Sequence, residues 1–117
     1  MAVTTTIHGI KNCDTCRKAL KVFADKALPH SYHDFRVDGL SEQQLDRWLK
    51  IVSWDKLLNR RGTSWRALPD GVKEAIDAAS AKKLMLENPT LIKRPVFETG
   101  NTVVVGFTKA EQETLGL

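Results

Sequence analysis

The chain has 117 residues, about the size of one domain. Hydrophobic residues make up 42% of it and charged residues 27%, a globular composition that excludes wholesale disorder and collagen-like architectures. The net charge of +4 suits anionic ligands and is too small to indicate nucleic acid. No apolar stretch approaches the roughly 20 residues of a membrane span, and the first residues lack the pattern of a signal peptide. We therefore expect a cytoplasmic monomer with no membrane or nucleic-acid partner.

The amino-terminal segment predicts a strand, a helix and a second strand. A β-branched run that alternates at Val3, Thr5 and Ile7 is typical of a strand, which Gly9 ends. Asn12 is expected to cap the helix that follows. Its apolar face is predicted from residues three and four apart, namely Cys16, Ala19, Leu20, Phe23, Ala24 and Ala27. Proline at position 29 ends the helix, and a short second strand is predicted after it, at 30–35.

A block of helices is predicted next, over residues 41–88. Ser41 and Gln44 match the Ser-x-x-Gln pattern of a capping box, which marks a helix start. The buried face of this helix is expected to hold Leu45, Trp48, Leu49 and Val52. Residues 54–58 predict one more helical turn, and residues 59–63 a polar, basic loop.

Two further helices are predicted in the second half of this block. Residues 69–71 predict a turn, and the helical face after it is expected to hold Val72, Ala75, Ile76 and Ala79. Ser80 is expected to cap a fourth helix that ends near Asn88. Because a block of this length buries an independent core poorly, we interpret it as an insertion and not as a second domain.

The tail predicts a β-hairpin and a terminal helix. Residues 91–97 are expected to be extended, because the residue before a proline avoids the helical region. Gly100 marks the hairpin turn and residues 102–105 form an apolar strand. Thr108 and Glu111 form a second capping box.

These elements predict one α/β domain over residues 1–117. The first β-α-β unit needs a parallel strand pair joined by a right-handed crossover, whereas the last two strands form an antiparallel hairpin. One mixed sheet with flanking helices accommodates both. We expect a core of about 1–40 and 89–117, with the helical insertion at about 41–88.

The two cysteines, Cys13 and Cys16, are the first indication of chemistry. A secreted disulfide-bonded protein would carry more cysteines, so one close pair indicates a functional thiol in a reducing compartment. Cys13 is expected at a helix start, where free N–H groups and the nearby Lys11, Arg17 and Lys18 favour the thiolate and lower its pKa. Cys16, one turn further, is expected to be the more buried thiol. We interpret Cys13 as the nucleophile and Cys16 as a candidate resolving thiol.

Two other interpretations of the cysteines compete with this one, a buried residue without chemistry and a zinc site. Cys16 also fits a small buried hydrophobe with no chemistry. A structural zinc site needs about four ligands, and no second Cys-x-x-Cys or His-x-x-x-His pattern accompanies the cysteines, so we expect no metal. The only histidines are His8, His30 and His33, of which the last two are expected at the surface.

Three arginines form a candidate anion site. Arg60 and Arg61 share the predicted polar loop, and Arg94 directly precedes Pro95. A guanidinium group contacts carboxylates and oxyanions in bidentate fashion. We expect one of Arg60 and Arg61 to be a solvated surface residue. The bond between Arg94 and Pro95, which opens a strand, is a candidate cis peptide bond.

Taken together, these residues resemble a known family. A strand, Cys-x-x-Cys at a helix start, a parallel strand and a proline that opens a hairpin form the thioredoxin-like pattern. More narrowly, the chain resembles the ArsC arsenate-reductase family, in its YffB/Spx-like branch. The motifs lie at 8–15 (His-Gly-Ile-Lys-Asn-Cys-Asp-Thr), 57–66 (Leu-Leu-Asn-Arg-Arg-Gly-Thr-Ser-Trp-Arg) and 91–95 (Leu-Ile-Lys-Arg-Pro). The resemblance covers essentially the whole chain.

The resemblance implies a thioredoxin/glutaredoxin-like fold with a helical insertion and the activity of a glutathione-dependent thiol reductase. Glutathione is then the co-substrate, or a glutaredoxin-type thiol donor is the partner. The implied catalytic set is Cys13, Cys16 and Arg94. The substrate-binding set is Lys11, Asn12, Arg60, Arg61 and Pro95, with either Arg60 or Arg61 facing the site.

One departure from the family concerns the substrate. Arsenate reductases of this family use a further arginine after the last strand, and none stands near Gly106 and Phe107, where it is expected. A thiol–disulfide reductase acting on another substrate therefore fits better than an arsenate reductase. The alternatives are a true arsenate reductase, a thioredoxin-like domain without thiol chemistry, and an Spx-like redox-switched transcription regulator that binds RNA polymerase.

Overall fold

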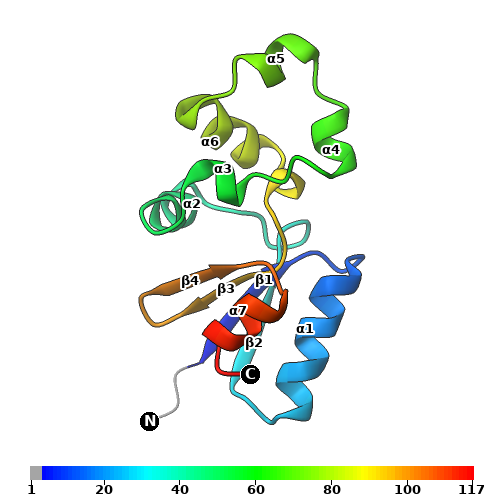
Figure 1. Cartoon of the computed structure of the whole chain (residues 1–117), viewed down its shortest axis with the longest axis vertical. Helices are drawn as coiled ribbons and strands as arrows, with labels where there is room; N and C mark the ends of the chain where they lie inside the picture. Colours follow the sequence, from blue (N-terminus) through cyan, green and yellow to red (C-terminus); the bar gives the residue numbers. More distant parts are fainter. Residues whose placement is uncertain (1–3) are drawn as a thin grey trace. The chain divides into compact units, whose positions relative to one another are not determined.

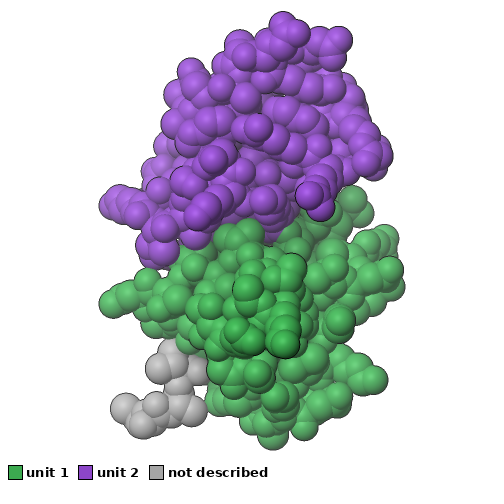
Figure 2. All heavy atoms as spheres, viewed as in Figure 1, with its two compact units in different colours: residues 1–38, 94–117 green, residues 39–93 purple. Residues whose placement is uncertain are grey.

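The structure is a computed structural model that describes residues 4–117 (Figure 1). In chain order its elements are β1 (Thr5–Gly9), α1 (Asp14–Asp25), β2 (His30–Asp34), α2 (Glu42–Leu49), α3 (Trp54–Leu57), α4 (Thr63–Arg66), α5 (Asp70–Glu74), α6 (Ala78–Glu87), the 3-10 helix η1 (Pro89–Leu91), β3 (Val96–Thr99), β4 (Thr102–Val105) and α7 (Lys109–Thr114). The described chain divides into two compact units, residues 4–38 with Arg94–Leu117 and Gly39–Lys93, coloured green and purple in Figure 2.

The first unit is built on a four-stranded mixed sheet in the order β2-β1-β3-β4. β1 and β2 are parallel, with Ile7 opposite Tyr32, and α1 connects them. β3 runs antiparallel to β1, with Phe97 opposite Ile7, and β4 completes a hairpin in which Val104 lies opposite Phe97. This is the predicted thioredoxin/glutaredoxin-like mixed sheet with flanking helices, and the fold class is confirmed. Val3, predicted to be part of the first strand, lies outside the described residues.

One face of this sheet carries the core of the first unit. Because Phe97 is the strand partner of both Ile7 and Val104, the three side chains point to the same side. The buried cluster consists of Ile7, Ala19, Phe23, Phe97, Val104 and Phe107, with Leu20, Val22, Leu28, Leu115 and Leu117 packed against it. α1 and the segment that ends in α7 therefore cover the same face (Figure 1).

The opposite face of the sheet holds a close polar contact between neighbouring strands. His8 on β1 is 1% exposed, and its Nε2 atom lies 2.8 Å from Oε1 of Glu98 on β3. The rings of His33 and Phe35 lie 5.0 and 6.2 Å from the His8 ring. His8 is thus a buried, partnered residue of the sheet.

The end of α1 differs from the prediction. The helix ends at Asp25, before the proline that was expected to end it, and Ala24 and Ala27, predicted on its apolar face, are exposed. The backbone turns out of the helix at Ala27, whose φ angle is +52°. The Leu28 N–H donates to the Phe23 carbonyl at 2.9 Å and the Ala27 N–H to the Ala24 carbonyl at 3.0 Å. These two bonds form a Schellman motif, which ends a helix without any proline.

The second unit, Gly39–Lys93, is helical and has buried residues of its own. Ser41 caps α2 as predicted, since its hydroxyl accepts the Gln44 N–H at 3.1 Å. The buried apolar residues are Leu45, Trp48, Leu57, Leu58, Ala81, Met85, Leu91 and Ile92. Lys82 joins α6 to α2, with Nζ at 2.8 Å from a carboxylate oxygen of both Glu42 and Asp46. These hydrogen bonds raise the pKa of Lys82.

The second half of this unit departs from the prediction. α4 was not predicted, and α5 begins at Asp70, where a turn was expected. Val72, Ala75 and Ala79, predicted to form a buried helical face, are exposed. Their spacing is helical, but α5 ends at Glu74 and α6 begins at Ala78, so these residues do not lie on one helix and share no face.

The cap of α6 and the segment after it also differ. Asp77 and not Ser80 is the N-cap: its Oδ1 accepts the Ser80 N–H at 2.8 Å, and the Ser80 hydroxyl accepts the Asp77 N–H at 3.0 Å. The two residues thus form a capping box with Asp77 first. The segment predicted to be extended, 91–97, begins inside η1 and reaches its strand only at Val96. Among the described residues, no helix is long and apolar enough to cross a membrane.

Candidate functional site

Cys13 lies at the junction between the loop after β1 and the first turn of α1. It is the N-cap residue of the helix, with extended φ and ψ angles of −128° and 115°, so the cap stands one residue later than the predicted Asn12. Cys13 is partly exposed, whereas Cys16 is 1% exposed. The prediction that Cys16 is the more buried thiol is confirmed. No disulfide bond joins the two cysteines in this structure.

The surroundings of Cys13 favour its thiolate. Partial burial acts to raise the pKa of Cys13, but hydrogen bonds from the Cys16 amide, the Cys16 thiol and the Arg94 guanidinium outweigh it, and the positive charge of Arg94 adds to them. The pKa of Cys13 is consequently lowered. The structure thereby brings together Cys13, Cys16 and Arg94, the three residues of the predicted catalytic set.

Cys16 shows the opposite behaviour. The pKa of the Cys16 thiol is raised to about 12, mainly by burial and also by the neighbouring Cys13, against a hydrogen bond from the Ile10 amide that lowers it. Its sulfur lies against the backbone of Gly9, where a Cβ atom would collide with it. Cys16 therefore holds its proton and donates it toward Cys13, so that the two thiols share one negative charge located mainly on Cys13.

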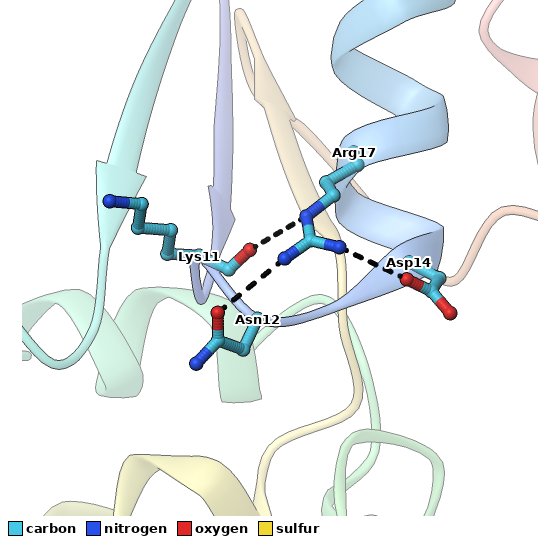
Figure 3. A network of polar contacts seen from close by, with 4 residues as sticks. All are labelled: Lys11, Asn12, Asp14 and Arg17. Atoms are coloured by element: carbon cyan, nitrogen blue, oxygen red, sulfur yellow. Dashed lines mark hydrogen bonds and ion pairs between the residues drawn. The ribbon is translucent and has the colours of Figure 1, made fainter.

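The Arg17 side chain forms hydrogen bonds with the loop that precedes Cys13 (Figure 3). Its Nε donates to the Lys11 carbonyl at 3.2 Å, and its two terminal nitrogens lie 3.5 Å from Asn12 Oδ1 and 3.3 Å from Asp14 Oδ1. The guanidinium group is more than half exposed. It holds Lys11 and Asn12, both predicted for substrate binding, which form the exposed loop before Cys13.

Pro95 follows Arg94 in the sequence, and Arg94 is the residue whose guanidinium group bonds the Cys13 sulfur. The peptide bond between the two is cis, as predicted. Pro95 is buried, and its carbonyl accepts the Gly106 N–H at 2.9 Å. This bond ties the start of β3 to the residue that follows β4.

Arg60 and Arg61 belong to the other compact unit, and their share in an anion site stays a prediction. The Arg60 guanidinium lies over two indole rings, at 5.5 Å from the centre of Trp54 and 5.7 Å from that of Trp65. The Arg61 carbonyl accepts a hydrogen bond from the Arg66 guanidinium at 2.9 Å. Of the two, Arg60 is the one whose side chain the fold holds in a defined environment.

Two residues at the end of β2 were missed by the sequence analysis. Asp34 is 8% exposed, and its carboxylate accepts the Lys11 N–H at 2.9 Å. Burial, and then the charge of Asp34, raise the pKa of Tyr32 to about 12, and a hydrogen bond between the two side chains contributes to the rise. The available signal was the parallel pairing of β1 and β2, because it places the carboxyl ends of both strands at the same edge of the sheet.

The arrangement supports nucleophilic thiol chemistry. A partly exposed thiolate, a second thiol within hydrogen-bond distance and an adjacent guanidinium group are what thiol–disulfide exchange and oxyanion reduction both require. No cluster of three or more histidine, cysteine, aspartate or glutamate side chains suited to a metal ion occurs within residues 4–117.

The chain is similar to several known proteins over most of its length. The sequence profile of the ArsC family matches residues 8–115. Among solved structures, a protein named YFFB (PA3664) is 36% identical, with a TM-score of 0.87 over 94% of this chain and 96% of its own. An arsenate reductase (ArsC) related protein from Brucella melitensis is 46% identical, with a TM-score of 0.79 over 97% and 93% of the two chains. The global transcriptional regulator Spx of Streptococcus agalactiae is 24% identical over 91% of this chain and 78% of its own length.

Proposed function

Since the chain belongs to the ArsC family, in its YffB/Spx-like branch, we propose that it is a glutathione-dependent thiol–disulfide reductase. The observation that carries the proposal is the opposite pKa shift of two adjacent thiols: Cys13 is prepared as a thiolate, and Cys16 keeps its proton. Such a pair attacks a disulfide with one sulfur and retains the other for a second step. The reaction needs a supply of reduced glutathione, which a reducing compartment such as the cytoplasm provides.

The proposed reaction has two exchange steps. The Cys13 thiolate attacks one sulfur of a substrate disulfide, which forms a mixed disulfide and expels the other sulfur as a thiolate that takes a proton from water. Glutathione thiolate, or Cys16 after losing its proton, then attacks the Cys13 sulfur and releases the reduced substrate. After attack by glutathione, a second glutathione completes the cycle. After attack by Cys16, two glutathione molecules in turn reduce the Cys13–Cys16 disulfide. In both routes two glutathione molecules become one glutathione disulfide for each substrate disulfide reduced.

Arg94 has a defined part in this proposal. Its guanidinium group donates to the Cys13 sulfur and stabilises the thiolate, and it presents further N–H donors to a carboxylate or oxyanion. Lys11, Asn12 and Pro95 line the approach to Cys13 in the proposed substrate site, to which Arg60 or Arg61 adds a second guanidinium group. Since no arginine stands near Gly106 and Phe107, where arsenate reductases of this family have one, arsenate is expected to be a poor substrate.

The experiment that tests the proposal measures turnover and thiol ionisation together. The purified protein is assayed with glutathione over a panel of small and peptide disulfides and arsenate, and the pKa of Cys13 is obtained from the pH dependence of its alkylation. Arg94→Ala should raise that pKa and reduce turnover, whereas Arg94→Lys should recover the pKa more than the turnover, because lysine restores charge without bidentate geometry. Efficient arsenate reduction, or no disulfide turnover by a protein whose Cys13 is reactive, would contradict the proposal.

A second candidate function is redox-switched transcriptional regulation. The observation that favours it is the similarity to Spx regulators over 91% of this chain, together with a Cys-x-x-Cys pair whose sulfurs lie within hydrogen-bond distance. Immobilised protein, oxidised or reduced, would be tested for capture of purified RNA polymerase. Redox-dependent capture that Cys16→Ser abolishes would favour the regulator, and absence of capture in both states would favour the reductase.

A further inference from the structure

Asp34 is the last residue of β2, its side chain is buried, and both of its carboxylate oxygens accept backbone N–H groups. Oδ2 accepts the Lys11 N–H at 2.9 Å. Oδ1 accepts the Arg36 N–H at 2.8 Å and the Val37 N–H at 3.3 Å. The Tyr32 side chain adds a further hydrogen bond. A buried carboxylate is costly unless it is bonded in this way, so the backbone here requires a hydrogen-bond acceptor at each of the two oxygens.

Of the backbone groups that donate to the Asp34 carboxylate, the Lys11 N–H comes from a distant part of the chain, two residues before the nucleophile Cys13. The same residue, Lys11, is held at its carbonyl by Arg17, at 3.2 Å. The loop between β1 and Cys13 is therefore fixed on one side by a residue of α1 and on the other by a residue of β2. The Phe35 N–H also donates to the Gly9 carbonyl at 2.9 Å, which continues the pairing of the two strands up to this point.

We propose that Asp34 is a positioning residue for Cys13. By anchoring the Lys11 amide, it sets the path of the loop that delivers the Cys13 sulfur to the Cys16 amide and to Arg94. Its role in turnover rests on the proposed reductase function, but its role in positioning Cys13 does not. Tyr32 supports the carboxylate through a hydrogen bond between the two side chains.

Both oxygens of Asp34 are needed as acceptors, which makes asparagine a sharp test. In either orientation, the side-chain NH2 of Asp34→Asn would face a backbone N–H, so one of the two sets of bonds is lost while the volume is unchanged. Loss of the anchor lets the loop move away from the donors that stabilise the Cys13 thiolate. Loss of the negative charge by itself acts in the opposite direction, since removing a nearby anion favours a thiolate.

These opposite signs separate a positioning role from a purely electrostatic one. The pH dependence of Cys13 alkylation by iodoacetamide would be compared in the Cys16→Ser background for the parent and for Asp34→Asn. Positioning predicts that the midpoint moves upward by about one pH unit, so that labelling at pH 6.5 slows roughly tenfold. A midpoint that falls, or one that stays unchanged while only thermal stability decreases, would overturn the proposal.

Asp38→Asn is the matched control. Asp38 is exposed in the same turn, and its carboxylate accepts the Asp34 N–H at 3.1 Å, but it does not touch the Lys11 amide. This variant removes the same charge from the same turn and should leave the alkylation midpoint where it is. An equal upward shift in both variants would overturn the specific role of Asp34.

A measurement on the unaltered protein covers the case in which Asp34→Asn does not fold. By NMR, the Lys11 amide should exchange with solvent at least about 100-fold more slowly than an unbonded loop amide, although its side chain is exposed. Tyr32→Phe should retain the fold and shift the alkylation midpoint upward by less than Asp34→Asn does. Rapid exchange of the Lys11 amide would overturn the proposed role of Asp34, whatever the enzyme assays show. If the Lys11 amide exchanges slowly but the protein has no turnover, the result counts only against the proposed function.

Discussion

Cys13 and Cys16 are separated by one turn of α1, and that turn determines which of them is reactive. Cys13 is the N-cap residue, directly before the first helical residue, Asp14. At this position the Cys16 amide and the Arg94 guanidinium group both donate hydrogen bonds to its sulfur. Cys16 is the first residue of the buried helical face and is covered by the backbone of β1. The same residue type therefore acts as an ionisable group at one position and as a protonated, buried group at the next turn.

This difference predicts the order of chemical labelling. At pH 6.5, below the usual thiol pKa of about 8.5, iodoacetamide should modify Cys13 well before Cys16, because the lowered pKa of Cys13 leaves a larger thiolate fraction. The sign follows from the direction of each shift: as pH falls, Cys16 loses its thiolate first and Cys13 last. Peptide mapping after short exposure measures the order. Preferential modification of Cys16 would contradict the assignment of the nucleophile.

Gly9 provides a second prediction at the residue scale. A Cβ atom at this position would collide with the Cys16 sulfur and lie 3.3 Å from its Cβ atom, so Gly9→Ala should destabilise the protein by about 1–3 kcal/mol. In a Cys16→Ala background most of that loss should disappear, because the sulfur is gone. Urea unfolding of the two single variants and the double variant measures the coupling.

Gly71→Ala is the control for this experiment. Gly71 lies in α5 with nothing within 4 Å of a Cβ atom, so alanine there should be neutral or stabilising by up to about 1 kcal/mol. If the penalty of Gly9→Ala were the same with and without the Cys16 sulfur, the close packing of Cys16 against β1 would not be its cause.

At the scale of the element, the carboxyl end of α1 is closed by a residue poorly suited to its backbone. The C′ position of the Schellman motif is Ala27, with φ of +52°, where glycine is the usual residue. An alanine in this region stores strain that glycine does not. The sequence therefore contains no sign of this helix end, which explains why the helix was predicted to continue to the proline.

Replacing that residue should stabilise the protein. Ala27→Gly is expected to raise the free energy of unfolding by about 0.5–1 kcal/mol, because relief of the left-handed strain exceeds the entropy that glycine adds to the unfolded chain. Ala24→Gly, at an exposed position inside the same helix, should lower it by about 0.5–1 kcal/mol. Urea unfolding of both variants gives the two values, and destabilisation by Ala27→Gly would show that the strain is negligible.

How much the sequence could predict depended on whether the signal was local. The parallel strands, the hairpin turn at Gly100 and the cap at Ser41 follow from patterns a few residues long, and they are confirmed. The contact between Cys13 and Arg94 joins residues far apart in the chain and was reached only through the family resemblance. Asp34 was not found, because a buried carboxylate that bonds backbone amides has the same sequence appearance as a polar turn residue.

At the scale of the molecule, the two compact units can be followed separately during unfolding, because the tryptophans lie in one unit and Cys16 lies in the other. All three tryptophans, at positions 48, 54 and 65, lie in Gly39–Lys93, whereas Cys16 lies in the sheet unit. The Lys93 N–H, the last of the helical unit, donates to the Leu57 carbonyl at 2.8 Å, and the next residue is Arg94 of the reactive site. The helical unit is therefore ordered up to the residue that contacts the nucleophile.

We predict that the two units unfold together as one domain. The helical unit is shorter than the roughly 60 residues at which independent folding is already marginal. In urea, tryptophan fluorescence and the reactivity of Cys16 toward a chromogenic disulfide, measured in Cys13→Ser so that one thiol reports, should give the same midpoint. A fluorescence transition complete while Cys16 is still protected would show two domains. Arg94 follows Lys93 without a linker. If the two midpoints coincide, a substitution at Leu57 or Leu91 that destabilises the helical unit should therefore expose Cys16 at a correspondingly lower urea concentration. Leu57→Ala tests this expectation.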